Sequence, residues 1–363
     1  YRFDMQANVQ STWNRIPQNQ IIMSLGYMGS MIFDEPLRKP GAGITLIPYV
    51  TSGYSQRFVE NGVRIPGKPV YSNDAGLDAK IQISSGLNLD LTANPDFSQV
   101  EVDEQVINLD RFEIFFPERR QFFLENADLF SSFGSERINP FFSRRIGVTQ
   151  DPSTGQNLQN PIYAGARLSG KLDNNWRVGL LSMQTARNNA IAQPSVNYTV
   201  AAMQRKVFSR SNIAAMFVNK QAFSSRDSAG AAFNRVAGLD YNLASSDNRL
   251  TGKVFYHRSF SPGGNSKAFA HGASAEYRVK RFAMGWEHQS VGRGYNAEVG
   301  FVPRKNYFSV NPYAMYFFYP GKGAFIQHNI GGAASVLWMP ELGRTDHEIN
   351  LWWEGNMRNT SEW

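Results

Sequence analysis

Residues 272–291 read GASAEYRVKRFAMGWEHQSV, and this stretch decides the fold class. Apolar and polar residues alternate along 272–279, pause at Lys280-Arg281, and alternate again along 282–291. The apolar set is Ala273, Ala275, Tyr277, Val279, Phe282, Met284 and Trp286, and the polar set is Ser274, Glu276, Arg278, Arg281, Glu287 and Gln289. Because a period of two directs successive side chains to opposite faces of a sheet, the stretch predicts two strands joined by a tight turn.

The same period recurs at 77–82, 87–92, 249–257 and 348–354. The apolar members are Leu77, Ala79, Ile81, Leu87, Leu89, Leu91, Leu250, Val254, Tyr256, Ile349, Leu351 and Trp353. The polar members are Asp78, Lys80, Gln82, Asn88, Asp90, Thr92, Thr251, Lys253, His257, Glu348, Asn350 and Glu354. Counting such runs along the chain, we expect about eleven strands after Pro161 and about four before Pro95.

The connections between the expected strands alternate in length. Tight turns are expected at 173–175, 209–211, 245–248 and 280–281, and long polar connections at 185–197, 220–234, 259–267 and 292–305. Outer-membrane barrels combine short periplasmic turns with longer external loops. Their strands need about 9–11 residues, whereas soluble strands average about five or six. These features favour an all-β fold, a transmembrane antiparallel β-barrel of about 14 or more strands, over a soluble sandwich.

The composition agrees with a barrel. The 363 residues are only 18% charged but 13% aromatic, and the mean hydropathy is −0.39. The longest apolar run, Ile21–Phe33, has about 13 residues, whereas a membrane-spanning helix needs about 20. We expect the following aromatic residues near strand ends, where rings meet the membrane–water interface: Trp176, Tyr241, Tyr256, Tyr277, Trp286, Tyr307, Tyr319 and Trp353.

Cysteine content and charge restrict the function. With no cysteine, the chain has no disulfide framework, thiol nucleophile or thiolate metal site. The net charge of +7 suits a solvated surface, a basic lumen or contact with anionic lipid. Nucleic acid is not an expected partner, because the sequence has no Lys/Arg block and no nucleic-acid-binding motif. We expect the bacterial outer membrane as the location, with its lipid and lipopolysaccharide as surroundings.

Between residues 94 and 147 the two-residue period disappears, and charged residues and Phe become dense together. Apolar residues spaced three and four apart predict a helix that ends before Pro117: Val102, Val106, Leu109, Phe112 and Phe116. Irregular backbone cannot face hydrocarbon, because its amides would lack partners. We therefore expect an internal plug, with a compact periplasmic or surface loop as the alternative.

The expected plug would be held by ion pairs within itself and with the inward strand residues Asp78, Lys80 and Asp90. The residues expected to line or hold it are Asn94, Pro95, Asp96, Phe97, Glu101, Phe116, Pro117, Glu118, Arg119, Arg120, Phe122, Phe123, Glu125, Ser143, Arg144 and Arg145.

Three runs in this segment resemble an outer-membrane family of the Bacteroidota type, whose barrel region is catalogued as a domain of unknown function. They are NPDFSQVE at 94–101, FFPERRQFFLE at 115–125 and FFSRRIG at 141–147. The resemblance extends more loosely over the strands on both sides. It departs at Gln121, where the family often has Pro, and at Asn126, where it often has Gly.

Members of that family usually carry, before the barrel, a domain resembling the family-nine carbohydrate-binding modules of xylanases. The run Trp13-Asn14-Arg15-Ile16-Pro17 resembles the stretch that joins this module to the barrel. The resemblance therefore implies an outer-membrane location and a link to glycans through a domain outside these 363 residues, but no reaction. We expect an internal piece of a longer precursor, divided into a linker at 1–20, first strands at 21–93, the plug-like segment at 94–147 and further strands at 148–363.

No catalytic constellation is recognisable in the sequence. The histidines fall on separate expected strands, and only His271 and His288 could approach one another across neighbouring strands. The acidic cluster Glu101, Asp103 and Glu104 lacks the glycine-centred loop of a calcium hand. His257, beside the 259–267 connection, is the one residue worth naming for a rim site. We expect no catalytic residue, no metal ligand and no cofactor.

The leading functional interpretation is an outer-membrane channel or receptor-like barrel linked to carbohydrate capture or uptake. A structural subunit of a larger envelope complex, such as a secretion or insertion machine, is the first alternative, with other envelope proteins as partners. A cell-surface glycan hydrolase is the second alternative, and a soluble lectin-like sandwich is the third.

Overall fold

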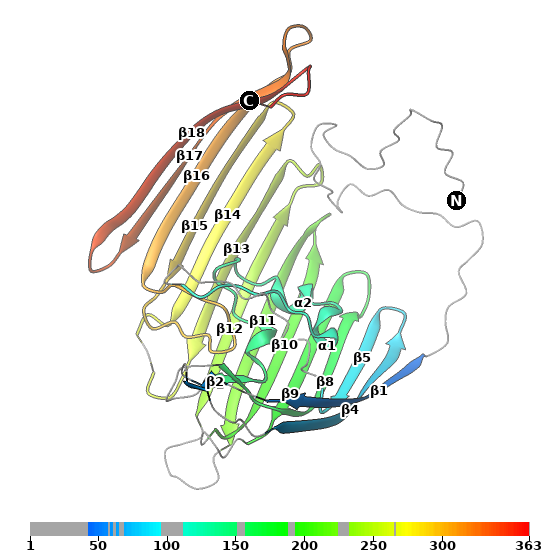
Figure 1. Ribbon diagram of the computed structural model, residues 1–363. Helices are drawn as coiled ribbons and strands as arrows, with labels where there is room; N and C mark the ends of the chain where they lie inside the picture. The colour runs from blue at the N-terminus through cyan, green and yellow to red at the C-terminus, as the bar shows by residue number, and fades with distance from the viewer. Residues whose placement is uncertain are drawn as a thin grey trace, which may run out of the picture.

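A computed structural model of the protein describes residues 43–56, 59–60, 63–64, 69–95, 112–150, 157–187, 193–223, 232–264 and 266–362. Its main feature is one antiparallel sheet of 14 strands, in which each strand pairs with its neighbours in chain order (Figure 1). The strands are β1 (Ile44–Ser55), β4 (Val70–Ser84), β5 (Leu87–Ala93), β8 (Ile162–Lys171), β9 (Trp176–Thr185), β10 (Ser195–Val207), β11 (Ser211–Phe223), β12 (Phe233–Ala244), β13 (Leu250–Phe260), β14 (Phe269–Val279), β15 (Phe282–Val291), β16 (Tyr307–Phe318), β17 (Phe325–Met339) and β18 (Gly343–Met357).

Smaller elements interrupt this meander at two places. The hairpin of β2 (Val59–Glu60) and β3 (Val63–Arg64) lies in the β1–β4 connection. The β5–β8 connection carries α1 (Gln121–Leu124), α2 (Asp128–Ser131), a 3₁₀ turn (Ser143–Arg145) and the hairpin of β6 (Val148–Gln150) and β7 (Asn157–Gln159). We call residues 94–161 the insert. Among the described residues, no helix is long and apolar enough to cross a membrane.

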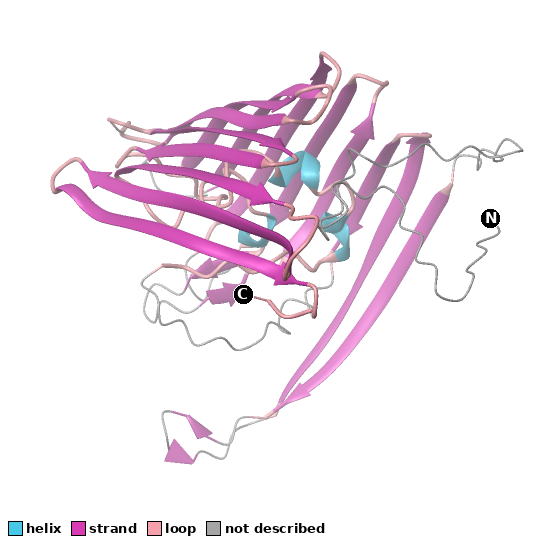
Figure 2. Cartoon of the chain, turned by 90° about the horizontal axis from the view of Figure 1, so that it is seen from above, coloured by secondary structure: helices cyan, strands magenta, loops and turns pink. Residues whose placement is uncertain are grey.

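The all-β antiparallel sheet expected from the sequence is confirmed, and eleven of its strands, β8 to β18, follow Pro161. Three strands of the sheet precede Pro95, where about four were expected. The sheet curves strongly but is not closed, because β1 pairs only with β4 and β18 only with β17 over the described residues (Figure 2). A barrel requires a hydrogen-bonded ladder between its first and last strands, so the expected closure is not seen in this structure.

The connections sort by length onto the two ends of the sheet. The turns β4–β5, β8–β9, β10–β11, β12–β13 and β14–β15 are short and lie at one end, which we call the short-turn end. The connections β5–β8, β9–β10, β11–β12, β13–β14 and β15–β16 are longer and lie at the opposite end, the long-connection end. The predicted alternation is confirmed up to β16. It stops at β17–β18, where only residues 340–342 connect the strands at the long-connection end.

The convex face of the sheet, which we call the outer face, is apolar and exposed. The strand register aligns large apolar residues along it, as where Leu239 of β12 lies opposite Tyr256 of β13, and Tyr277 of β14 opposite Met284 of β15. Their side chains have little cover: Leu239 is 62% exposed and Trp286 is 50% exposed. Residues of the same kind recur on the other strands: Leu77, Leu91, Leu180, Met203, Ile213, Phe217, Val254, Phe308, Tyr316, Ile330, Ile349, Leu351 and Trp353.

The concave face, or inner face, differs between its two halves. On β13–β15 and β18 it carries the predicted polar residues, such as Lys253, Glu276 and Glu287. On β9–β12 the inner face is instead largely apolar. Leu181, Met183, Val200, Met216, Val218 and Val236 are buried there. These strands are apolar on both faces because the insert packs against the inner one.

The aromatic residues follow the expected interfacial positions only in part. Trp176 begins β9, and Tyr241 and Tyr277 lie close to the ends of β12 and β14. Tyr256 and Trp286 instead lie near the middle of β13 and β15. Tyr307 begins β16, but it lies opposite Val291 and is buried on the inner face. Their ring positions are set by cross-strand packing as well as by distance from the strand ends.

Candidate functional site

The insert leaves and re-enters the sheet at the long-connection end. Asn94, which follows β5, adopts a positive φ of 51° and donates its backbone N–H to the Tyr163 carbonyl of β8 at 2.9 Å. Its side-chain amide donates to Asp74 at 2.5 Å and to the Ala75 carbonyl at 2.8 Å. The exit and return of the insert are therefore fastened to each other and to β4. Pro95 is half-buried beside this junction.

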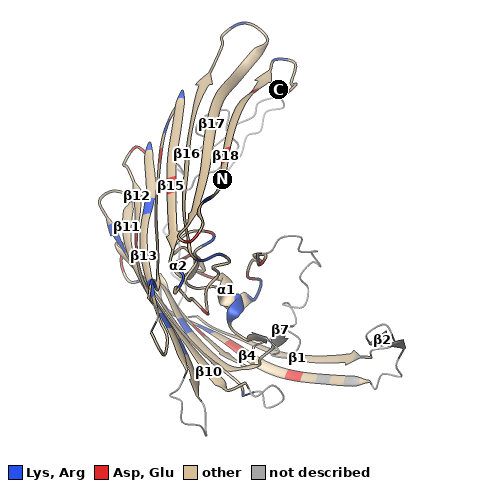
Figure 3. Cartoon of the chain, turned by 90° about the vertical axis from the view of Figure 1, so that its left-hand side faces the viewer, with Lys and Arg blue, Asp and Glu red and all other residues tan. Residues whose placement is uncertain are grey.

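From that junction the insert reaches the opposite end of the strands along the inner face (Figure 2, Figure 3). Glu125 pairs with Lys80 of β4 and accepts a hydrogen bond from Asn88 of β5 at 2.6 Å, next to the short β4–β5 turn. Asp128 of α2 pairs with Arg177 at 2.6 Å, at the start of β9. The insert therefore has contacts near both ends of the strands.

Aromatic side chains of α1 and α2 anchor the insert on the apolar part of the wall. Phe122, Phe123, Leu129 and Phe130 are buried and belong to the same core as Leu181 and Val200 of the strands. Phe130 lies against Gly179 of β9, where a Cβ would be only 2.6 Å from its ring. The α2 helix therefore packs against β9 at a position that has no side chain.

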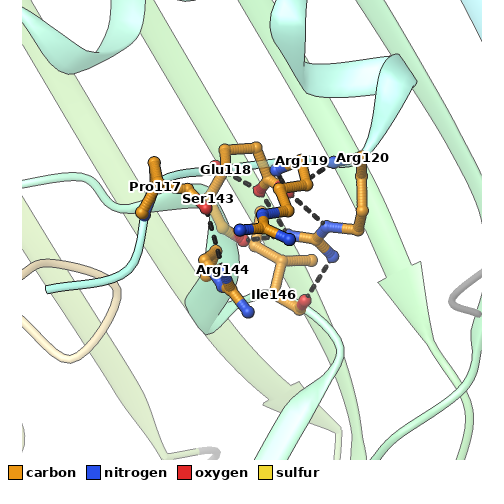
Figure 4. Close-up of polar contacts among 7 residues, drawn as sticks. All are labelled: Pro117, Glu118, Arg119, Arg120, Ser143, Arg144 and Ile146. Carbon is orange, nitrogen blue, oxygen red and sulfur yellow. Dashed lines mark hydrogen bonds and ion pairs between the residues drawn. The ribbon is translucent and has the colours of Figure 1, made fainter. Parts of the chain in front are cut away.

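Glu118 and Arg120 form the polar centre of the insert (Figure 4). Arg120 is 5% exposed and makes a two-point contact with Glu118, at 2.9 Å through Nε and 2.7 Å through Nη2. Its Nη1 donates to the Ile146 carbonyl, and its Nη2 also donates to the Ser143 carbonyl. The Ser143 hydroxyl donates to Glu118 at 2.6 Å. The runs 115–125 and 141–147 are thus bound together by one partly buried carboxylate.

The acidity of Glu118 follows from these contacts. Burial favours its neutral form, but hydrogen bonds and charge from Arg120, together with the Ser143 hydroxyl, outweigh burial and lower the pKa of Glu118 below its ordinary value. Glu118 is therefore ionised at neutral pH, and the ion pair is present whenever the insert has this structure.

The remaining predicted residues surround this centre. Arg144 donates to the Pro117 carbonyl at 2.9 Å and lies over the Phe116 ring at 5.7 Å. Arg145 pairs with Glu113 at 2.5 Å and donates to the Gly300 carbonyl of the β15–β16 connection. Arg119 donates its backbone N–H to Glu118. Asp96, Phe97 and Glu101, together with Asp103 and Glu104, lie outside the described residues.

The prediction of a helix ending before Pro117 is wrong for the part of it that the structure describes. Residues 113–120 have no helical structure, and the rest of the predicted helix, 102–111, lies outside the described residues. Phe115 instead packs in a cluster with Phe142 and Phe301, at centroid distances of 5.0 and 5.3 Å. Contacts with a connection almost 200 residues away along the chain override the local three-and-four spacing.

The expected pairing of Lys80 with the insert is present, but Asp90 and Asp78 have other partners. Asp90 pairs with Arg167 of neighbouring β8 at 2.8 Å, and the guanidinium lies 5.3 Å from the Phe122 ring centroid. Asp78 accepts a hydrogen bond from Thr92. Arg167 was not among the predicted residues, although its position opposite Asp90 on the neighbouring strand makes it a cross-strand pair of a kind that alternation can indicate.

A second anchor, also missed, lies on β12 and β13. Asp240 is buried, its Oδ1 is 2.8 Å from His257 Nε2, and its Oδ2 is 3.1 Å from Lys253 Nζ. The same Oδ2 accepts the Gly134 backbone N–H at 2.7 Å, and Lys253 also donates to the Ser132 carbonyl. His257 is fully buried, so the suggestion of a rim site at this histidine is wrong. It helps to fix Asp240 beneath the insert.

His271 and His288, the two histidines expected to be able to approach one another, lie side by side on the outer face. The rings of His271 and His288 lie 5.8 Å apart between centroids. Within the described parts of the chain, no group of three or more His, Cys, Asp or Glu side chains has the arrangement of a metal site.

These features define an all-β protein with a strongly curved 14-stranded antiparallel sheet and an ion-paired insert on its concave face. The chain belongs to the family described as Domain of unknown function (DUF5916), whose model matches residues 40–359. A comparison with the curated proteins finds no match.

Among solved structures, OccAB2 of Acinetobacter baumannii is similar over 87% of this chain and 89% of that chain, with 10% identity and a TM-score of 0.29.

Proposed function

We propose that the protein is an outer-membrane β-barrel that acts as a channel whose lumen is partly filled by the insert. One observation carries the proposal: large apolar side chains cover the outer face of nearly every strand and are exposed. Soluble proteins seldom expose continuous apolar surface of this extent, and such surface marks contact with a membrane or a partner. Hydrocarbon lipid is the partner that suits an unbroken convex surface.

The outer face also has a polar border at the long-connection end. Asn197 of β10 donates to Gln184 of β9 at 3.3 Å, and Arg235 of β12 donates to Asn219 of β11 at 3.0 Å. The apolar residues Leu180, Met203 and Leu239 lie on the same strands further toward the short turns. This border is where we expect the strands to leave the hydrocarbon, with lipopolysaccharide beside Arg235 and the longer connections outside the cell.

The insert supports a plug better than a surface loop. Its described residues bond to β4, β5, β8, β9, β10, β12 and β13, and its apolar side chains share one buried core with the strands. Irregular backbone is tolerated at membrane depth only where protein or a water-filled cavity surrounds it. A channel with such a filling would have restricted rather than open conductance.

Single-channel recording of the full-length protein in planar lipid bilayers tests the proposal. A variant combining Glu125→Gln and Asp128→Asn removes two charged anchors while leaving the apolar core in place. We expect a higher or more frequently interrupted current than in the wild type, because the end of the insert near the short turns is loosened. Asp247→Asn, in an exposed short turn, is the matched control and is expected to behave as the wild type.

The same recordings can also contradict the proposal. Absence of any conductance in the wild type and in the double variant, from protein that co-fractionates with the outer membrane, would contradict a channel. It would favour the receptor-like barrel or the structural subunit of an envelope complex. The link to glycans is a hypothesis that rests on the family resemblance alone, through a domain outside this chain.

A further inference from the structure

The described residues of the insert cover one part of the inner face. Hydrogen bonds from its described residues end on strands β4 to β13 and on the β15–β16 connection. The inner face of β14–β18 is polar toward the short-turn end, whereas Ala270, Val291 and Tyr307 at its long-connection end belong to the buried core shared with the insert. A solute that crosses a barrel filled in this way would meet the side chains of β14–β18 on one side and the insert on the other.

The charged side chains on the inner face of these strands are mostly acidic. The strand register places five carboxylates and one guanidinium on the inner face of β14–β18: Glu276, Glu287, Asp346, Glu348, Glu354 and Arg278. Arg278 is itself paired with Glu276 at 2.9 Å. Asp346 has Arg304 at 3.6 Å, near the long-connection end. The wall therefore carries net negative charge, although the whole chain carries +7.

A groove of about 650 Å³ crosses this wall over β13–β18. Its inward lining includes Ser274, Glu276, Glu287, Asn311, Tyr313 and Asn350. The groove exists because Gly285, Ala333 and Ser335 occupy inward positions where larger residues would fill it. It is thus a hollow in the sheet surface bordered by carboxylates, amides, one aromatic ring and, at its β13 edge, the ammonium group of Lys253.

The ring of Tyr313 lies over Gly285 in the lining of the groove. A Cβ on Gly285 would be 2.2 Å from the Tyr313 Cε1, so the ring occupies the space above this glycine. The Tyr313 hydroxyl donates to Glu276 at 2.5 Å, which fixes the ring orientation. An aromatic ring carries negative potential on its π face, and here the Glu276 carboxylate is bonded to the hydroxyl at its edge.

Glu287 lies one row away, opposite Ser274 and Asn311. It accepts a hydrogen bond from the neutral amide of Gln289, which leaves its charge uncompensated by that contact. The cation nearest to this row along the wall, Lys253, is bound to Asp240 and to the Ser132 carbonyl. The lysine therefore contributes little repulsion toward a positive solute in the groove.

We propose that the inner face of β14–β18 lines a cation-selective path, and that Tyr313, Glu276 and Glu287 form a site in it for small organic cations bearing ammonium or guanidinium groups. This inference rests on the proposed channel. An ammonium or guanidinium group is attracted by a ring face and by adjacent carboxylates, and rings of carboxylates confer cation selectivity on pores. Anions would be repelled by the same wall.

Reversal potentials in planar bilayers under a KCl gradient test the selectivity. We expect the wild type to prefer potassium over chloride, and Glu276→Gln with Glu287→Gln to shift the reversal potential toward zero. The control is Glu341→Gln, which removes the same charge from the exposed β17–β18 turn and is expected to leave the reversal potential unchanged. A channel that conducts without cation preference, or whose preference the double variant does not alter, would overturn the inference.

Block by free arginine tests the site itself. Arginine added to the bath is expected to interrupt the potassium current of the wild type, and Tyr313→Leu is expected to weaken this block while potassium still passes. Equal block in both proteins would overturn the role of the ring. Complete absence of current in the wild type and in the variant combining Glu125→Gln and Asp128→Asn would instead refute the proposed channel, so the two failures are distinguishable.

Discussion

The Oδ2 atom of Asp240 accepts the backbone N–H of Gly134 at 2.7 Å, which joins β12 to the insert across 106 residues of sequence. The same carboxylate contacts His257 and Lys253 and is almost completely buried. A buried carboxylate with three partners is costly to disturb, because removing its charge leaves the neighbouring cation uncompensated. This contact is therefore a principal attachment of the insert to the wall.

Replacing Asp240 tests that attachment. We expect Asp240→Asn to destabilise the folded protein by about 3 kcal/mol, since Lys253 loses its buried counter-charge. We also expect the insert to become more sensitive to protease. Urea unfolding in detergent, with limited trypsin digestion, measures both effects. Asp247→Asn, in the adjoining exposed turn, should change neither, and an unchanged unfolding midpoint in Asp240→Asn would contradict the assignment.

The Glu118–Arg120 pair predicts a pH dependence of the insert. The folded pKa of Glu118 lies below its ordinary value of 4.5, so its contribution to stability is complete above that value. This contribution is lost as the pH falls through the lowered folded pKa. We expect the wild type to lose stability in this acidic range more steeply than Glu118→Gln, in unfolding curves followed from pH 7 downward. Parallel curves for the two proteins would contradict the prediction.

The close approach of Phe130 to Gly179 predicts a steric effect. In Gly179→Ala the new methyl group would lie 2.6 Å from the ring, so α2 must move away from β9. Overpacking of this kind costs about 1–3 kcal/mol. Gly321→Ala is the matched control, because a Cβ at Gly321 meets nothing within 4 Å. Thermal unfolding should give a lower melting temperature for Gly179→Ala than for Gly321→Ala. Equal melting temperatures would refute the close contact between Phe130 and Gly179.

Adjacent residues of β14 offer a test of the two faces. Ala273 lies on the outer face opposite Val254, and Ser274 lies on the inner face opposite Lys253 and Glu287. An arginine facing lipid near the bilayer midplane costs about 2–4 kcal/mol, whereas the lumen tolerates charge. We expect Ala273→Arg to lower stability in lipid vesicles far more than Ser274→Arg. The reverse order would mean that the faces are assigned wrongly.

The alternation of residues was sufficient to predict the strands where each face has a single environment. β14 and β15 are the best example, because one face of each is apolar and exposed and the other is polar. In β10, by contrast, Val200 is buried by the insert while Met203, on the opposite face, is 45% exposed. Such a strand has no clean two-residue period, since both of its environments are apolar.

The insert was harder to predict than the strands. Its charge density and its incompatibility with hydrocarbon indicate that it lies inside, but local spacing misassigned Phe115 and Phe116 to a helix. Phe115 packs against Phe301, and the backbone N–H of Gly134 is bound by the Asp240 carboxylate. Neither partner can be identified from one sequence, because nothing in the local pattern links segments that far apart.

Contact between the outer face and lipid is the claim on which the rest depends, and fluorescence quenching in vesicles of brominated lipid tests it most directly. Trp286 of β15 lies on the outer face, whereas Trp352 of β18 lies on the inner face with its Nε1 bonded to Asn329. In single-tryptophan variants, bromines on the acyl chains should quench Trp286 strongly and Trp352 weakly. Equal quenching of both, or quenching of Trp352 alone, would contradict a membrane-facing convex sheet.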